Sequence, residues 1–444
     1  MNVKIRKLLV DPILQEDLTV MGWVRSVRDQ GQVKFIMLND GSCFQSLQVV
    51  VGSEFSDLSL KGVTVGASII VDGTLQESLG KGQKYDFVAT NIRVQGGCPQ
   101  DYPLQKKGHS NEFLRGISHL RSRTNTFSAV FKVRAELAYA IHEFFHQRGF
   151  TYVHTPLITG SDCEGAGETF VVDNGKGNFF GREAYLTVSG QLHAESLVAG
   201  LGDLYTFGPT FRAENSNTKR HAAEFWMVEP EMVFCELPEL IEMAEDFIKS
   251  VVNHVAISCR AELEFFQKFV DKEVLVRINE ILNKKFVHIS YTEAVDLLLK
   301  SGKKFQYPTG WGMDLQTEHE RFLTEDYFKC PVFVTDYPKD IKSFYMKENP
   351  DGKTVAAVDL LVPTIGEIIG GSQREDNYEV LRNRMIQCGM KVDSYQWYLD
   401  LRKYGAAPSS GFGLGFERLV MYVTGMDNIR DVIPYPRTAN KLEY

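Results

Sequence analysis

Short apolar runs separated by Gly, Asp and Ser turns characterise the first part of the chain. The five runs read LTVMGWV, VKFIML, LQVVV, ASIIVDG and YDFVATNIRV. Regularly spaced runs of this length predict short strands, and five of them predict a small β-barrel over residues 1–98. The next segment, residues 99–124, contains two prolines, several basic side chains and no clear periodicity. We interpret it as a linker to a larger domain at 125–444.

A long amphipathic helix is predicted for residues 126–148. Most of its apolar side chains recur at i, i+3 and i+4, and Gly149 is a suitable helix-ending residue. The following run, FTYVHTPLIT, predicts a strand that Pro156 interrupts, because proline has no amide hydrogen for a central ladder. Five phenylalanines from Phe127 to Phe150 are a large apolar load for one helix. Either a dimer contact or an internal core would bury them.

Two apolar runs at 205–211 and 222–232 enclose a polar loop and predict an antiparallel hairpin. Because side chains alternate along a strand, Phe225 and Glu229 share one face of the return strand. A planar guanidinium suits a phosphate, and an aromatic ring suits a stacked base. Arg212 and Phe225 could therefore hold a nucleotide by both ends. The alternative is a surface hairpin whose charges are only solvated.

Isolated charges interrupt the apolar runs of residues 356–376. Asp359, Glu367 and Arg374 lie in or directly after runs that predict a buried strand pair, where a charge is costly unless it is paired or binds a ligand. Carboxylate oxygens suit Mg²⁺. An internal salt bridge is the alternative for Glu367 and Arg374.

The remaining C-terminal pattern is uneven. Residues 238–258 predict a helix, whereas residues 259–350 mix helical and strand-like pieces that the pattern does not order. Residues 409–438 predict a strand with three alternating glycines, followed by a helix that opens near Glu417. Alternating glycines leave a flat surface for a flat base. Arg418 in the first helical turn can meet a phosphate.

Composition narrows the class of protein without naming it. The 444 residues suggest two or three domains, and 43% apolar with 24% charged residues are ordinary for a globular protein. No apolar run approaches the roughly 18 residues that span a bilayer, and we find no signal or transit peptide at the N-terminus. The seven cysteines show no CxxC spacing, which favours reduced thiols in the cytoplasm and argues against structural zinc. The net charge of −8 excludes indiscriminate nucleic-acid binding but not a local basic groove.

Several motifs resemble one family in order along nearly the whole chain. FRAE, a loop and then RHxxEFxMxExE resembles motif 2 of class II aminoacyl-tRNA synthetases, in the class IIb subgroup for aspartate, asparagine and lysine. GFGLGFERL resembles motif 3, and EIIGGSQRE lies between the two motifs. GWVRSVRDQGQVKFIMLNDGS resembles the anticodon-binding OB-fold of the subgroup. The resemblance implies an α+β protein: an OB-fold barrel, then a catalytic domain with an antiparallel sheet of six to seven strands flanked by helices.

The same resemblance implies an ATP site and a chemistry. An amino acid is activated as its adenylate and then transferred to tRNA, with ATP and Mg²⁺ as cofactors. Arg212 would hold the α-phosphate, Arg418 the γ-phosphate, and Phe225 would stack on adenine. Catalytic roles fall on Arg212, Glu214 and Arg418, and the implied ATP-binding set is Arg212, Glu214, His221, Phe225, Glu367, Gly415 and Arg418. Glu367 matches a metal position of the family directly, and Asp359 matches one only if a residue is inserted.

Within the subgroup, the residues favour asparagine and its tRNA as substrates. The aspartyl pattern QLxK has a lysine that pairs with the substrate carboxylate, and Ala194 stands at that position here. A buried lysine opposite a neutral amide would be left unpaired, so its loss fits asparagine. The implied amino-acid-binding residues are Glu164, Gln191, Glu229 and Arg374.

Anticodon and dimer contacts are also carried over from the resemblance. Phe35 would stack on an anticodon base, Gln48 would read a base edge, and Arg28 would meet a phosphate. Motif 1 of the family forms the homodimer interface, and Pro156 lies in the corresponding segment. Three alternatives stay open: an aspartyl enzyme, including a non-discriminating one; a catalytically inactive module that binds RNA or protein; and a tRNA-independent asparagine synthetase, which would not need residues 1–98.

Overall fold

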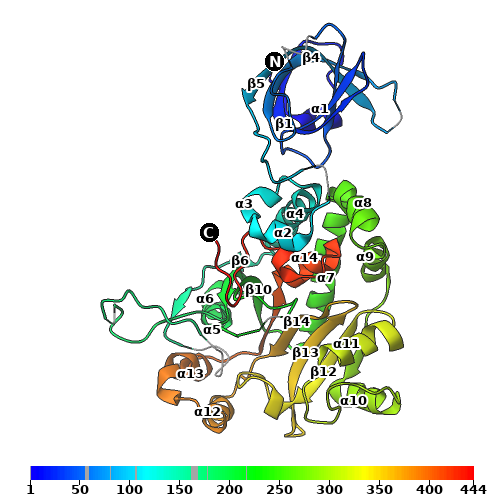
Figure 1. Ribbon diagram of the computed structural model, residues 1–444. Helices are drawn as coiled ribbons and strands as arrows, with labels where there is room; N and C mark the ends of the chain where they lie inside the picture. Colours follow the sequence, from blue (N-terminus) through cyan, green and yellow to red (C-terminus); the bar gives the residue numbers. More distant parts are fainter. Residues whose placement is uncertain are drawn as a thin grey trace. The chain divides into compact units, whose positions relative to one another are not determined.

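The structure is a computed structural model. It describes residues 2–55, 60–80, 82–105, 108–161, 169–177, 179–216 and 218–444. The chain forms two compact units, Met1–Ala129 and Val130–Tyr444, and each is described by itself (Figure 1).

The N-terminal unit contains the predicted five-stranded barrel. Its strands close in the order β1-β2-β3-β5-β4. They are β1 (Leu18–Asp29), β2 (Lys34–Asn39), β3 (Leu47–Val51), β4 (Ser68–Glu77) and β5 (Tyr85–Gly96). Alternate side chains point inward, so Val20, Val49 and Phe87 are fully buried. Helix α1 (Ile5–Val10) adds Ile5 and Leu8 to this core. The OB-fold prediction is confirmed.

The segment interpreted as a linker contains two short helices that the pattern did not predict. They are α2 (Asn111–Gly116) and α3 (Ser118–Arg121). Ser110 caps α2 by accepting a hydrogen bond from the Phe113 amide. Helices of six and four residues are too short to show a 3.6-residue periodicity, so no helical pattern predicted them.

The second unit is built on one eight-stranded sheet. Its order is β11-β12-β13-β14-β15-β10-β9-β6. The strands are β6 (Thr151–Tyr152), β9 (Leu204–Phe211), β10 (Glu224–Val233), β11 (Val287–Ser290), β12 (Val332–Pro338), β13 (Thr354–Val362), β14 (Gly366–Gln373) and β15 (Ser409–Gly415). The predicted hairpin is β9 and β10, which pair antiparallel from Leu204 to Phe211.

The sheet is mixed rather than wholly antiparallel. The six inner strands pair antiparallel, as predicted, but β11 pairs parallel with β12 and β6 pairs parallel with β9. These edge strands have four and two residues, so their sequences carry little strand signal. Pro156 lies between β6 and β7 (Ile158–Thr159), and β7 leaves the main sheet to pair with β8 (Tyr185–Leu186).

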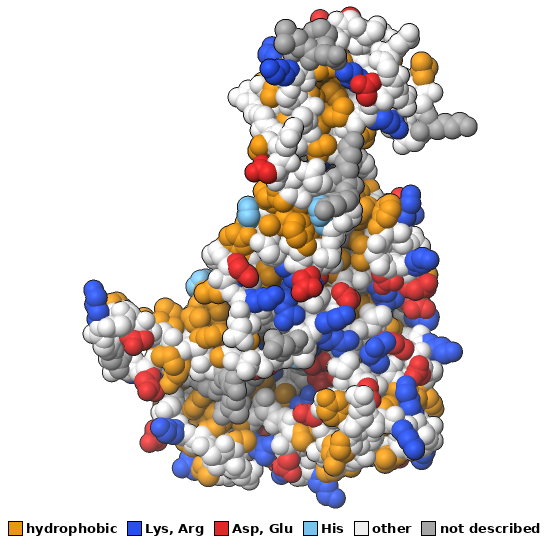
Figure 2. Space-filling model, viewed as in Figure 1, with side chains coloured by type: hydrophobic (Ala, Val, Ile, Leu, Met, Phe, Trp, Pro, Cys, Tyr) orange, Lys and Arg blue, Asp and Glu red, His pale blue; other side chains and the backbone are white. Residues whose placement is uncertain are grey.

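Helices cover this sheet (Figure 1), and the visible face of this unit carries both basic and acidic side chains (Figure 2). Helix α7 (Leu237–Ser258) matches the predicted helix and packs on β13, β14 and β15. Within the described residues, no helix is long and apolar enough to cross a bilayer. The other helices are α4 (Asn125–Gln147), α5 (Gln191–Glu195), α6 (Val198–Leu201), α8 (Arg260–Phe269), α9 (Val274–Asn283), α10 (Tyr291–Lys300), α11 (Thr317–Arg321), α12 (Tyr378–Gln387), α13 (Gln396–Lys403) and α14 (Phe416–Thr424).

An aromatic core receives much of the phenylalanine load of α4. The rings of Phe145 and Tyr205 stack with centroids 4.5 Å apart, and Phe144 and Phe145 both contact Phe247 of α7. Phe144, Phe145 and Phe150 are buried. An internal core therefore buries these side chains. The same contacts hold α4 and α7 against β9, the first strand of the hairpin.

Gly73 of β4 provides a test of the barrel packing. A methyl group at this position would overlap the carbonyl oxygen of Val88 in β5, which is backbone and cannot move aside. Overpacking of this kind costs about 1–3 kcal/mol. We therefore expect Gly73→Ala to accelerate amide hydrogen exchange in β4 and β5 by roughly 5- to 100-fold in the full chain.

Gly97→Ala is the matched control. A methyl group there meets no atom within 4 Å, so exchange in β4 and β5 should stay at the wild-type rate. Equal exchange rates in the two variants would contradict the close approach of β4 and β5 at Gly73.

Candidate active site

A pocket of about 840 Å³ opens over β10, β14 and β15. It draws residues from the β9–β10 loop, from the centre of the sheet and from the first turn of α14. All seven side chains and backbone positions predicted for ATP lie in its lining: Arg212, Glu214, His221, Phe225, Glu367, Gly415 and Arg418. Residues separated by about 200 positions in the sequence thus come together in one place.

The floor of the pocket is formed by one face of the inner strands. The Arg212 guanidinium lies over the Phe225 ring, 5.4 Å from its centroid. Met227, two residues along β10, projects toward Gly413 of β15, where an added Cβ would lie 2.8 Å from its Cε atom. The glycine therefore accommodates the Met227 side chain as well as keeping the floor low, which the sequence interpretation did not include.

The β9–β10 loop is held against the rest of the unit by Arg220. Its guanidinium donates to the Thr317 hydroxyl of α11 at 3.2 Å and to the Thr364 carbonyl at 2.7 Å. His221, next in sequence, contacts the Thr218 hydroxyl through Nδ1. Burial lowers the pKa of His221, and its cationic neighbours Arg418 and Arg212 add to that effect against Glu214.

Carboxylates converge at the other side of the pocket, over Gly370 of β14. A Cβ on this glycine would lie 2.9 Å from Glu367 Oε1 and 3.4 Å from Asp359 Oδ1. Lys342 donates to Asp359 at 2.7 Å. Glu320, which the sequence reasoning missed, accepts from the Glu367 amide at 3.3 Å. Burial, with the charge of Glu367 adding to it, raises the pKa of Glu320 to about 8.

The donor set can be tested for Mg²⁺. In the part of the chain that the structure describes, no three His, Cys, Asp or Glu side chains form a ready-made metal cluster. Mg²⁺ in phosphate sites usually takes only one or two carboxylates and completes its shell with water and phosphate oxygens. Glu367 and Asp359, converging over a glycine, fit that pattern.

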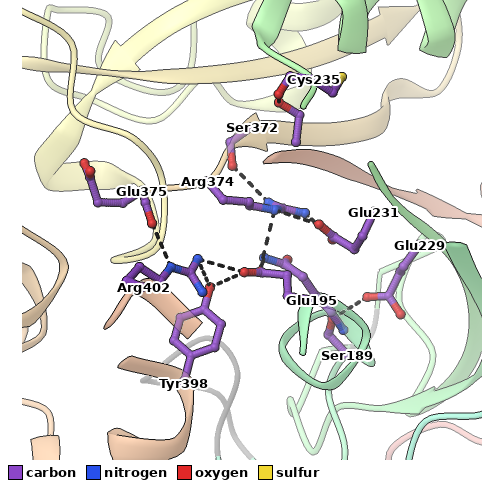
Figure 3. A network of polar contacts seen from close by, with 12 residues as sticks. Ser189, Glu195, Glu229, Glu231, Cys235, Ser372, Arg374, Glu375, Tyr398 and Arg402 are labelled. Atoms are coloured by element: carbon purple, nitrogen blue, oxygen red, sulfur yellow. Dashed lines mark hydrogen bonds and ion pairs between the residues drawn. The ribbon is translucent and has the colours of Figure 1, made fainter. Parts of the chain in front are cut away.

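A second group of charged residues is buried beside the pocket on the same face of the sheet. Glu229 accepts from the Gly190 amide at 3.0 Å and from the Ser189 hydroxyl. Arg374 binds the carboxylate of Glu231 with both Nε and Nη2, and its Nη1 donates to Ser372 at 2.9 Å (Figure 3). Arg374 and Glu231 are 2% and 0% exposed, so both charges depend on this pairing.

Glu195 connects this group to helix α13. Its carboxylate accepts from Arg402 at 2.8 Å, from Tyr398 at 2.6 Å and from Gln191 at 3.0 Å. It also lies 3.6 Å from Nε of Arg374 (Figure 3). The charges of Arg402 and Arg374 lower the pKa of Glu195 in spite of its burial.

The three anticodon candidates share one outer face of the barrel. Arg28 and Phe35 are opposite each other in the β1–β2 register, with the Arg28 guanidinium 5.1 Å from the ring centroid. Gln48 on β3 pairs with Asp86 on β5, and its amide nitrogen donates to that carboxylate at 3.0 Å. The cation, the aromatic ring and the amide therefore lie on the same side of neighbouring strands, although Gln48 is only 8% exposed.

One predicted residue lies outside the described part of the chain, and several residues of the site were not predicted. Glu164 lies outside the described residues. Glu231 was missed although it stands two residues after Glu229 and so shares its face. Glu195 was missed although it lies one helical turn after Gln191. Tyr398 and Arg402 lie on α13, about 200 residues away in the chain, and no local pattern points from them to the site.

Comparison with known proteins agrees with this geometry. The family described as tRNA synthetases class II (D, K and N) matches residues 110–439, and the OB-fold nucleic acid binding domain matches residues 18–95. The protein therefore belongs to the class II tRNA synthetases of the aspartate, lysine and asparagine group. It is an aminoacyl-tRNA synthetase, as the motifs predicted.

Several similar proteins within that group are asparagine enzymes. The chain is 56% identical to the asparagine--tRNA ligase of Acetivibrio thermocellus, with 97% of this chain and 96% of the relative covered. It is 53% identical to that of Clostridium tetani over 100% of both chains. The asparaginyl-tRNA synthetase of Pyrococcus horikoshii complexed with asparaginyl-adenylate superposes with a TM-score of 0.90 at 34% identity, covering 100% of this chain and 99% of that structure.

The anchoring of the β9–β10 loop can be tested through Arg220. The Ile429 amide donates to the Lys219 carbonyl at 2.8 Å, so its hydrogen exchange reports whether the loop is docked. The two hydrogen bonds that the Arg220 guanidinium donates, to Thr317 and to Thr364, are worth roughly 1–3 kcal/mol together. We expect Arg220→Ala to accelerate exchange at Ile429 by about 5- to 100-fold.

Lys219→Ala is the neighbouring control. Its ammonium pairs with Asp427, but both side chains are 67% exposed, and such pairs contribute little. Exchange at Ile429 should change less than about threefold in this variant. An equal acceleration in both variants would show that Arg220 does not anchor the loop.

Proposed function

We propose that this protein ligates asparagine to tRNA(Asn), using ATP, through an asparaginyl-adenylate intermediate. The observation that carries the proposal is that Glu229 and Arg374 lie buried beside the pocket of Arg212, Phe225 and Arg418, on the same face of the sheet. One face thus offers adjoining sites for a nucleotide and a small polar side chain. The names of the most similar relatives support the same substrate.

In the proposed reaction, the nucleotide end of the site positions ATP. Phe225 stacks on the adenine with His221 beside it, Arg212 binds the α-phosphate and Arg418 binds the γ-phosphate. The asparagine carboxylate attacks the α-phosphorus in line, the bond to the β-phosphate oxygen breaks, and pyrophosphate leaves. A ribose hydroxyl of tRNA then attacks the activated carbonyl, and AMP leaves. Rate acceleration comes from positioning and charge neutralisation, because no covalent enzyme intermediate forms.

Glu367 and Asp359 would hold Mg²⁺ at this end. When bound, the ion neutralises phosphate charge and fixes the orientation of the triphosphate. Glu214 and Gly415 complete the lining. The ion pair between Arg418 and Glu367, 3.6 Å apart, holds the arginine next to the proposed metal position.

The amino-acid end selects the side chain. Arg374 donates to the side-chain carbonyl of asparagine, and Glu229 accepts from its NH₂ group. Gln191 lies on the same side, with its amide fixed by Glu195. Glu164 is proposed to approach the substrate ammonium, as in the family pattern.

The barrel face is proposed to read the anticodon. Phe35 stacks on a base and Arg28 meets a phosphate. A carboxylate can only accept hydrogen bonds, so the NH₂ of Gln48 must face Asp86. The carbonyl oxygen of Gln48 is then the group left for a base, and it requires an N–H donor on that base.

We propose that the protein is a homodimer, with Pro156 in its interface, and that it acts in the cytoplasm. Tyr139 on α4, Tyr152 on β6 and Ile158 on β7 are large apolar or aromatic side chains left exposed around this segment. Their exposure is consistent with a partner surface beside Pro156.

ATP–pyrophosphate exchange tests the activation step. With asparagine and no tRNA, the purified protein should exchange labelled pyrophosphate into ATP, and with aspartate it should exchange at least ~1000-fold less efficiently. The reason is that Glu229 requires a donor that aspartate lacks. Efficient exchange with aspartate would overturn the substrate while keeping the class. Exchange with neither amino acid would favour a binding module.

Glu229→Ala tests the side-chain selector. A buried acceptor for the substrate NH₂ group accounts for much of the discrimination, so its loss should reduce the asparagine-to-aspartate ratio of kcat/KM by at least ~10-fold. The KM for ATP should change less than about threefold, because Glu229 does not line the nucleotide pocket. An unchanged ratio would contradict the role of Glu229.

A further inference from the structure

Five buried ionic side chains surround the proposed amino-acid end of the site (Figure 3). They are Glu195, Glu229, Glu231, Arg374 and Arg402. The side chains of Glu195 and Glu231 are 3% and 1% exposed, and that of Arg402 is 6% exposed. Charges at this depth are poorly screened, so their sum matters to anything that binds among them.

The sum is unequal. Three carboxylates face two guanidinium groups, which leaves a surplus of one negative charge. Glu375 is left out of this sum because it contributes only its backbone carbonyl to Arg402, while its carboxylate accepts from the Glu348 and Asn377 amides. Glu231 is exposed to both sides of this sum: burial and the charges of Glu195 and Glu229 raise the pKa of its carboxyl, and the charge and hydrogen bonds of Arg374 lower it.

The network also fixes Arg374, the cation proposed to contact the substrate side chain. Arg374 donates its Nε hydrogen and one Nη2 hydrogen to Glu231, and one Nη1 hydrogen to Ser372. A guanidinium has five N–H bonds, so two remain for a ligand. Glu195, at 3.6 Å from the Arg374 Nε, lowers the positive potential of this guanidinium without occupying those hydrogens.

The neutral carbonyl of asparagine and the anionic carboxylate of aspartate would change the buried charge of this group differently. The carbonyl of asparagine can use the two remaining N–H bonds at no change of charge. The carboxylate of aspartate would raise the buried surplus from one negative charge to two. Shape offers little discrimination here, because the two side chains are nearly the same size.

We propose that Glu195 is a specificity-determining residue of this enzyme: its carboxylate holds Arg374 in place and supplies the negative charge that excludes aspartate. The inference rests on the proposed function and adds an electrostatic basis to it. Glu195 acts through Arg374 and through the field of the pocket, so it is a positioning residue and not a catalytic one.

Glu195→Gln tests the proposal by removing the charge at nearly constant shape. We expect the ratio of kcat/KM for asparagine over aspartate in pyrophosphate exchange to fall by at least ~10-fold, with a lower KM for aspartate. Such a gain toward aspartate is a result that structural damage would not produce. A ratio within about twofold of the wild-type value would overturn the proposal.

Glu195→Asp is the matched control because it keeps the charge and shortens the side chain. Its overall activity should fall, and its asparagine-to-aspartate ratio should remain within about threefold of wild type. A drop in the ratio as large as that of Glu195→Gln would show that side-chain geometry, not charge, sets the discrimination, and would also overturn the proposal.

A measurement on the wild-type protein does not depend on the folding of any variant. L-Aspartate β-hydroxamate is neutral and larger than aspartate, so it should inhibit asparagine-dependent exchange at a concentration at least ~10-fold lower than L-aspartate does. Weaker inhibition by the hydroxamate than by L-aspartate would mean that side-chain size, and not charge, limits binding, against the proposal. If wild-type protein shows no asparagine-dependent exchange at all, the proposed function itself fails, which is a separate outcome.

Discussion

The buried ion pair between Arg374 and Glu231 is the interaction on which the centre of the sheet depends. Removing either partner would leave an uncompensated charge in a site with almost no solvent, which is far more costly than losing a surface pair. Gly411 of β15 is paired with Glu231 in the register of β10 and β15, and a Cβ there would lie 2.5 Å from the Glu231 carboxylate. A side chain on β15 would therefore expel the carboxylate, so the ion pair and the glycine require each other.

This requirement fixes the register of three strands. A shift by one residue would turn Glu231 to the opposite face and bring a side chain in place of Gly411. The same register places Met227 against Gly413 and leaves Phe225 at the pocket. Gly411 and Gly413 of β15 therefore make room for side chains of β10, whereas an added Cβ at Gly415 would lie next to Arg418. Their spacing reflects strand packing at one end and ligand access at the other.

Local alternation explains which parts were predictable from sequence. The barrel, the hairpin and the residues Arg212, Phe225 and Glu229 follow from period-two patterns and a recognisable motif. Glu320 lies in a region where short helices, a π-helix (Phe322–Tyr327) and two strands succeed one another without a long periodic run. Arg402 reaches Glu195 from about 200 residues away. Contacts of this kind form only when distant segments fold together, so local patterns along the sequence do not reveal them.

The two ends of the site differ in solvent access for a physical reason. A triphosphate carries its own charges and water, so the charged side chains proposed to face it can remain partly open; the Arg418 and Glu367 side chains are 31% and 42% exposed. The asparagine side chain brings no net charge, and the groups proposed to surround it, Arg374, Glu231 and Glu195, already satisfy one another. Phe225 and Glu229 are four residues apart, about 13 Å along a strand. One strand thus spans an open charged site and a closed one, which is the combination that the proposed aminoacyl-adenylate requires.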